Sequence, residues 1–137
     1  MSTRATYEIV YNIGSSAVFY IHHDGYPKGA AQYFKATLDV MRMTNRDFLP
    51  SFQWANEQAE MIARHNLAGD TEYRYVIERV LPVVEARYHK VSVMKRTSFC
   101  PEEFEQEWEG SLLDFIEVYS QEVLSCDGVW ISNCPTV

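Results

Sequence analysis

The first part of the chain alternates between apolar and polar positions with a period of two. In residues 5–12, Tyr7, Ile9 and Tyr11 share one side, and such alternation of aromatic and β-branched residues predicts a strand. The turn sequence Gly14-Ser15-Ser16 separates it from a second predicted strand over residues 17–23. Because the connection is so short, the two strands are expected to form an antiparallel hairpin.

Two helical patterns follow this hairpin. Apolar residues recur at spacings of three and four in residues 30–43, which predicts one buried face of a helix entered through Pro27. A second helix is expected to begin after the N-cap Asp47 and to end before Gly69. Its predicted apolar stripe comprises Phe48, Phe52, Ala55, Ala59 and Ile62.

Residues 71–96 return to alternation, with tyrosine, valine and isoleucine opposite charged residues. The pattern predicts a strand over residues 73–78, a break at Leu81-Pro82, a strand over residues 83–89, and a continuation or third strand over residues 91–95. A helix over residues 75–91 remains an alternative because several valines also fit a helical period, although Pro82 disfavours it.

The longest helical stripe lies near the C-terminus. It predicts a helix over residues 101–123, capped at Cys100 or Ser98, with the stripe Phe104, Trp108, Leu112, Phe115, Tyr119 and Val123. The apolar tail from Ser125 is expected to pack back on the sheet as a short strand or an irregular arm. Together these elements predict a single α+β domain over residues 1–137, with an antiparallel sheet of four or five strands covered by three helices.

Charge is segregated along the chain. All 12 Lys and Arg residues lie within residues 1–100, whereas residues 101–137 carry only acids, and the net charge is −7. No apolar run is long enough to cross a membrane, and the first residues do not form a secretory signal. Three irregularly spaced cysteines suit a reducing compartment. We therefore expect a cytoplasmic protein that does not contact a membrane.

The acids of the predicted C-terminal helix are the first candidate site. Like charges three or four residues apart on a helix repel by about 0.2–0.5 kcal/mol per pair. Such a face is either simply solvated or is recognised by a basic partner, which would be attracted over a distance. The candidate partner-binding residues are Glu102, Glu103, Glu105, Glu107, Glu109, Asp114 and Glu117.

A turn rich in titratable groups is the second candidate. Strand geometry would place His22 and Asp24 on one face and His23 on the other, beside Tyr26. This pattern fits a ligand-binding site, or the centre of a small hydrolase or metal-binding enzyme. The alternative is structural, with Asp24-Gly25 simply making the turn. Because no ligand spacing or cofactor motif accompanies the turn, we predict no metal, no cofactor and no catalytic residue.

A basic cluster offers a third interpretation, direct binding of nucleic acid with Tyr73, Tyr75 or Tyr88 as stacking platforms. The cluster comprises Arg74, Arg79, Arg87, Lys90, Lys95 and Arg96. Interleaved acids and the negative net charge oppose the approach of phosphate. We therefore expect no direct nucleic-acid partner.

The opening Ser2-Thr3-Arg4-Ala5-Thr6-Tyr7-Glu8-Ile9 and the segment His22-His23-Asp24-Gly25-Tyr26-Pro27 resemble a group of small phage and prophage proteins. The resemblance covers roughly the first 35 residues and brings no catalytic assignment. It implies a protein of a mobile element that binds and disables host machinery, in the manner of anti-CRISPR inhibitors. The expected partner is then a host protein or nucleoprotein complex with a basic surface, and the many aromatic residues leave room for a homodimer interface.

Overall fold

The two predicted N-terminal strands form the centre of the observed sheet. The computed structural model describes residues 3–12, 14–79 and 85–132. β1 (Ala5–Asn12) pairs antiparallel with β2 (Ser15–Ile21), with Tyr7 opposite Phe19. On its other side β1 pairs with β4 (Tyr73–Glu78), and this pair is parallel.

The sheet is mixed and has six strands in the order β3-β2-β1-β4-β5-β6. β3 (Glu60–Ile62) lies beside β2, and β5 (Lys90–Phe99) pairs with both β4 and β6 (Glu102–Ser111). The predicted α+β class and the three helices are confirmed, whereas the predicted antiparallel sheet of four or five strands agrees only roughly, because the sheet has six strands and one of its pairs is parallel. The chain passes through two helices between β2 and β4, and such a crossover allows β4 to run parallel to β1.

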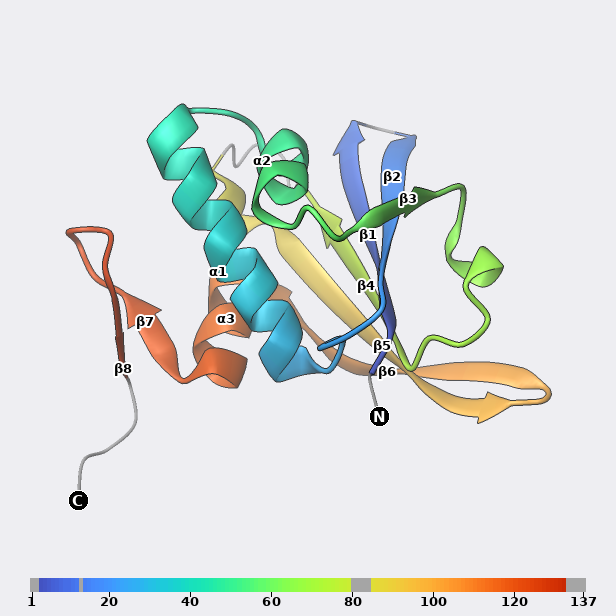
Figure 1. Cartoon of the computed structure of the whole chain (residues 1–137). Coiled ribbons are helices and arrows are strands. Elements are labelled where there is room, and N and C mark those ends of the chain that lie inside the picture. Colours follow the sequence, from blue (N-terminus) through green and yellow to red (C-terminus); the bar gives the residue numbers. More distant parts are fainter. Residues whose placement is uncertain (1–2, 13, 80–84, 133–137) are drawn as a thin grey trace, which may run out of the picture.

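The three helices cover one face of this sheet (Figure 1). α1 (Pro27–Thr44) begins at the predicted proline and ends at Asn45, which adopts a left-handed φ of 57°. α2 is Phe48–Ala55 and α3 is Leu112–Ser120. Aromatic side chains fill the space beneath them, and the rings of Tyr7 and Tyr75 stack 4.9 Å apart in the core. The apolar faces that the sequence predicted for β1, α1 and β4 are therefore largely buried, although Tyr11 of β1 is 45% exposed and Leu38 of α1 is only half-buried.

The second predicted helix is shorter than its apolar pattern. α2 ends at Ala55, followed by the buried Asn56, whose side chain donates to the carbonyl of Phe52 at 3.0 Å. Residues 60–62 extend instead as β3, where Met61 lies opposite Phe19. Pairing with the edge of β2 thus outweighs the helical spacing of Ala59 and Ile62.

The largest correction concerns residues 101–123. Residues 102–111 form β6, Cys100 lies in the turn of the β5–β6 hairpin, and only residues 112–120 are helical. The spacing of four between Phe104 and Trp108 fits a strand as well as a helix, while the glutamates at every second position follow the period of a strand. The true cap is Ser111, whose hydroxyl accepts from the backbone N–H of Asp114 at 3.1 Å.

The remaining segments differ in part from their patterns. The strands over residues 73–78 and 91–95 are confirmed, and the alternative helix over residues 75–91 is wrong where it meets β4. Residues 86–88 form η2 (Ala86–Tyr88), a short 3₁₀ helix, instead of a strand. The predicted break at Leu81-Pro82 lies outside the described residues.

The C-terminal segment forms a separate hairpin of β7 (Glu122–Leu124) and β8 (Trp130–Ser132). It was expected to pack on the sheet, but it lies beside α1 (Figure 1). Trp130 Nε1 donates to Asp39 at 3.2 Å, and Arg42 binds the carbonyl of Gly128. Among the helices that the structure describes, none is long and apolar enough to span a membrane.

Candidate functional site

Five of the predicted partner-binding acids lie on one edge strand. β6 is the last strand of the sheet, and among the described residues no strand pairs with its outer side. All five side chains are exposed. We call this set the acidic edge: Glu102, Glu103, Glu105, Glu107 and Glu109.

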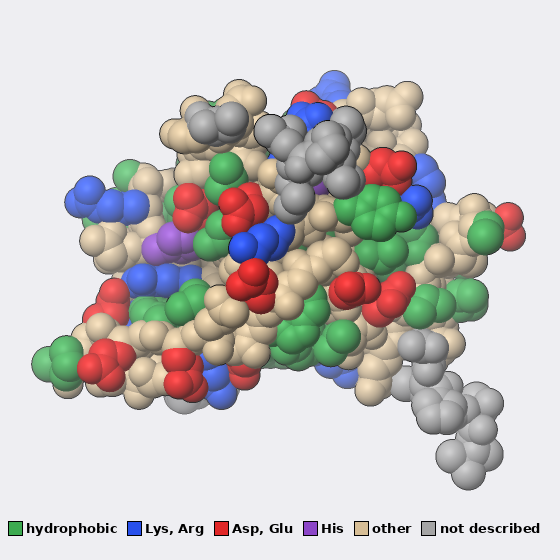
Figure 2. Space-filling view, turned by 180° about the vertical axis from the view of Figure 1, so that it is seen from behind, with side chains coloured by type: hydrophobic (Ala, Val, Ile, Leu, Met, Phe, Trp, Pro, Cys, Tyr) green, Lys and Arg blue, Asp and Glu red, His purple; other side chains and the backbone are tan. Residues whose placement is uncertain are grey.

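Two members of the acidic edge are neutralised by the neighbouring strands. Glu102 accepts from Arg74 at 2.8 Å and lies 3.5 Å from Arg96. Glu109 binds the ammonium group of Lys90 at 2.9 Å. Hydrogen bonds from Arg74 and from Lys90 lower the pKa values of these two glutamates below that of a free side chain. Figure 2 shows acidic and basic side chains interspersed on this reverse side of the molecule.

The middle of the acidic edge lacks such ion pairs in the described part of the chain, although Lys95 lies opposite Glu105 where β5 pairs with β6. Glu103, Glu105 and Glu107 form no ion pair within the described part of the chain, and Glu107 lies at a bulge between Gln106 and Trp108. A β-bulge leaves its extra residue outside the regular ladder. Within the described residues, these three are therefore the glutamates of β6 that form no ion pair.

The other two predicted acids are not part of the edge. Asp114 lies exposed in the first turn of α3, and Glu117 lies half-buried one turn later. The single acidic helix expected from the sequence is thus divided between a strand and a helix. The prediction of one acidic helix therefore joined two separate surfaces into one.

A buried arginine fixes the base of the β5–β6 hairpin. Arg96 is 8% exposed, and its guanidinium donates to the carbonyls of Thr71 at 2.6 Å and Gly69 at 3.1 Å. Its Cζ also lies 4.6 Å from the ring centroid of Phe104 and 4.3 Å from that of Phe99. A guanidinium group that lies over the face of an aromatic ring is attracted to that ring electrostatically. The hairpin that carries the acidic edge is therefore tied to the loop before β4.

The nucleic-acid interpretation loses two of its three candidate stacking platforms, whereas the third, Tyr88, is 45% exposed. Tyr73 and Tyr75 are buried in the core, so neither can act as a stacking platform. The guanidinium of Arg87 pairs with Glu85 at 2.8 Å. Four members of the basic cluster form ion pairs with acids of this chain: Arg74, Arg87, Lys90 and Arg96.

The histidine turn does not bring its predicted ligand residues onto a common strand face. β2 ends at Ile21, and Asp24 adopts a left-handed φ of 55°. His22 points to Glu60, 3.3 Å away, while the hydroxyl of Tyr26 donates to Asp24 at 3.3 Å. His23 is exposed, and its backbone carbonyl accepts from Tyr33.

Close packing explains the shape of that turn. A side chain at Gly25 would meet the backbone N of Ala5 at 2.9 Å, and one at Gly29 would overlap the carbonyl oxygen of Asp24. The carbonyl of Gly25 accepts a 2.6 Å hydrogen bond from the buried hydroxyl of Tyr75. These contacts seat the turn against β1 and the core. Within the described residues no group of three or more His, Cys, Asp or Glu side chains could hold a metal ion.

No sequence pattern predicted the row of hydrogen-bonded polar side chains on the face of the sheet opposite the helices. His65 Nδ1 lies 2.6 Å from the hydroxyl of Thr6, and His65 Nε2 lies 3.0 Å from Glu8. Burial lowers the pKa of His65, and the hydrogen bond to Glu8 opposes this effect. The order hydroxyl, imidazole, carboxylate resembles a nucleophile with its base, but Thr6 is fully buried and cannot meet a substrate. These hydrogen bonds instead anchor η1 (His65–Leu67) to β1.

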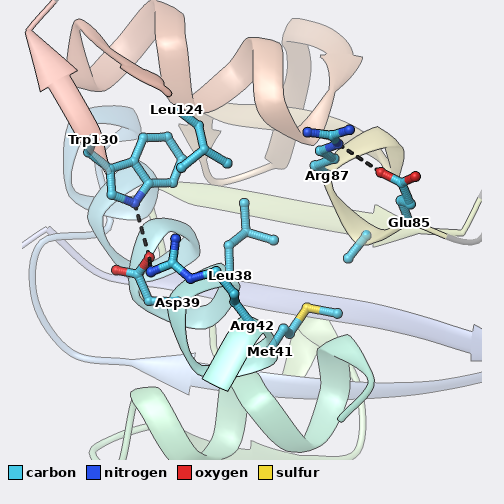
Figure 3. A pocket seen from close by; sticks show the side chains of 9 residues that line it. Leu38, Asp39, Met41, Arg42, Glu85, Arg87, Leu124 and Trp130 are labelled. Atoms are coloured by element: carbon cyan, nitrogen blue, oxygen red, sulfur yellow. Dashed lines mark hydrogen bonds and ion pairs between the residues drawn. The ribbon is translucent and has the colours of Figure 1, made fainter. Parts of the chain in front are cut away.

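A cavity of about 450 Å³ is the second feature that the sequence did not predict. It lies between α1, η2 and the β7–β8 hairpin (Figure 3). Its lining joins three distant segments of the chain: Leu38, Asp39, Met41 and Arg42 from α1, Glu85, Ala86 and Arg87 at η2, and Leu124 and Trp130 from the hairpin.

Comparisons of the chain with protein-family models, with curated proteins and with solved structures give no match. The functional argument therefore depends on the geometry of the acidic edge and of the cavity.

Proposed function

We propose that this chain is a small acidic binding protein, and that a basic surface of a protein or nucleoprotein complex binds along the acidic edge. The observation that carries the proposal is the contrast within β6. Glu102 and Glu109 form ion pairs with cations of this chain, whereas Glu103, Glu105 and Glu107 form none among the described residues, although Lys95 lies opposite Glu105 in the strand pair. A row of cations on a partner would give the three middle glutamates the kind of ion pair that Glu102 and Glu109 already form.

Electrostatics favours such a partner. Residues two apart on a strand lie about 7 Å from each other, and two like charges at that distance repel by about 0.6 kcal/mol in water. Cations placed beside Glu103 and Glu105 would replace this repulsion by attraction and would also accelerate association. The exposed backbone edge of β6 adds unpaired N–H and C=O groups that an extended partner segment could bind.

The resemblance of residues 2–9 and 22–27 to phage and prophage proteins extends the proposal. In this view the chain is a phage-type inhibitor that acts in the host cytoplasm, and a CRISPR surveillance complex is one candidate target. Surfaces that hold nucleic acid are basic, so an acidic strand could occupy such a surface in place of the nucleic acid.

Charge reversal tests the proposal. We expect a variant carrying Glu103→Lys and Glu105→Lys to lose its captured partner in a pull-down from bacterial lysate. The wild-type chain should capture that partner well at low salt and poorly at high salt, because salt screens exposed charges.

The matched control carries Glu57→Lys and Asp127→Lys, two exposed acids outside the acidic edge, and has the same net charge. It should retain the partner, and circular dichroism should show that both variants are folded. Equal capture by the two variants would contradict the proposal. Equal capture is the result expected if the glutamates only prevent β6 from pairing with the edge strand of another molecule.

A further inference from the structure

The cavity between α1, η2 and the β7–β8 hairpin has no role in binding at the acidic edge. Its volume of about 450 Å³ lies within the range of small-molecule sites, about 300–1,000 Å³. Such sites combine apolar walls with a few polar groups that orient the ligand. The walls and the polar groups of this cavity therefore indicate what it can hold.

The walls are largely apolar, and the Trp130 side of the cavity is held in place by polar contacts. Leu38 and Met41 project from α1, and Leu124 and Trp130 face them from the hairpin (Figure 3). The indole of Trp130 donates to Asp39, and the ammonium group of Lys35 lies 5.3 Å from its ring centroid. An apolar ligand would thus enter a preformed space without first ordering the indole.

Most charged groups at the rim are already engaged. Asp39 accepts from Trp130 and lies 3.5 Å from Arg42, whose other terminal nitrogen binds the carbonyl of Gly128. Arg87 differs, because only its Nε donates to Glu85. Within the described residues, neither terminal nitrogen of Arg87 has a hydrogen-bond acceptor, although its guanidinium lies over the ring of Tyr88.

We propose that this cavity binds an apolar monocarboxylate. The hydrocarbon body lies between Leu38 and Leu124, and the carboxylate accepts from the two terminal nitrogens of Arg87. A guanidinium presents parallel N–H donors that match a carboxylate, and such charge-assisted pairs are stronger than neutral hydrogen bonds. The proposed ligand places its only charge beside Arg87, whose two terminal nitrogens have no acceptor within the described residues.

Calorimetric titration with decanoate, below its micelle concentration, tests this assignment. We expect one site on the full chain and an affinity at least tenfold lower in Arg87→Gln, because a charge-assisted hydrogen bond is lost. The affinity for decan-1-ol should be the same in both proteins. The exposed Arg64→Gln variant should bind decanoate like the wild type.

A second pair of variants tests the location. Leu124→Trp fills the cavity and should abolish decanoate binding, whereas Val118→Trp, at a residue that is 54% exposed on α3, should leave it unchanged. Circular dichroism checks that each variant is folded. The Glu103→Lys and Glu105→Lys variant should still bind decanoate, so this proposal and the proposed function can fail separately.

The proposal is overturned if decanoate does not bind, or if Leu124→Trp binds it normally. Equal decanoate affinity in the wild type and Arg87→Gln would also overturn it. The same holds for tighter binding of decylammonium than of decanoate, because Glu85 and not Arg87 would then select the ligand.

Discussion

At the scale of single residues, His65 joins two segments that are far apart in the sequence. Its Nε2 lies 3.0 Å from Glu8, and its Nδ1 lies 2.6 Å from the hydroxyl of Thr6. The carboxylate can only accept, so Nε2 carries the proton, and in the neutral imidazole Nδ1 then accepts from the hydroxyl of Thr6. Burial favours this neutral form and lowers the pKa of His65, although the hydrogen bond to Glu8 opposes that effect.

This arrangement predicts that acid weakens the fold. The pKa of His65 is lower in the native state than the ordinary value of about 6.5, so the unfolded chain takes up a proton first. The free energy of unfolding should fall as the pH drops below about 6.5, and it should level off below the native pKa. Urea unfolding at a series of pH values measures this dependence.

Burial lowers the pKa of His89 as well, so that residue contributes in the same direction. His65→Gln should therefore reduce the dependence without removing it, whereas His23→Gln, at an exposed site, should leave it as in the wild type. An unchanged slope in His65→Gln would contradict this role of His65.

At the scale of elements, the β5–β6 hairpin is the part of the molecule that carries the acidic edge. It extends beyond the helical layer (Figure 1), and Arg96 ties its base to Thr71 and Gly69. Buried arginines with several hydrogen bonds are costly to remove, because the carbonyls that they satisfied lose their partners. Arg96 therefore helps to hold the acidic edge in position, together with the pairing of β5 and β6.

Arg96→Met keeps much of the apolar stem but removes the donors. We expect the free energy of unfolding to fall by about 2–4 kcal/mol, measured by urea denaturation. Arg64→Met, at an exposed residue, should change it by less than about 0.5 kcal/mol. A loss as small as that in Arg96→Met would show that the guanidinium does not hold the hairpin.

The same hairpin shows why pattern alone misassigned the C-terminal third. Glutamate favours helices, and the spacing from Phe104 through Trp108 to Leu112 continues into a real helix. The bulge at Glu107 places Trp108 opposite the core residue Val93, while Phe104 lies opposite Arg96. Pairing with β5 decided the conformation, and single-sequence periodicity contains no information about that partner.

Sequence patterns predicted the elements correctly where the contacts that stabilise them join residues close together in the sequence. The β1–β2 hairpin and α1 were predicted from alternation, turn residues and Pro27. The acids of β6 were selected as candidates from their charge alone, and the sequence pattern placed them on a helix instead of a strand. The cavity was not predicted, because its walls come from residues 38–42, 85–87 and 124–130, and no short motif links them.

At the scale of the whole molecule, charge and cavity define two surfaces with separate chemistry. The negative charge of the C-terminal segment is concentrated on β6, at one edge of the sheet, whereas the cavity lies beside α1 and the β7–β8 hairpin. Within the described residues, the arginines and lysines of β4 and β5 form ion pairs with Glu102 and Glu109 but with no other member of the acidic edge. The remaining carboxylates are the surface on which the proposed function depends.

Hydrogen–deuterium exchange of the chain, alone and with its captured partner, tests the central claim most directly. Amides on the outer side of an edge strand exchange readily unless a partner covers them. We predict that binding slows exchange in residues 102–109 and leaves residues 30–43 of α1 unchanged. Slower exchange around the histidine turn or the cavity, with β6 unaffected, would contradict the account.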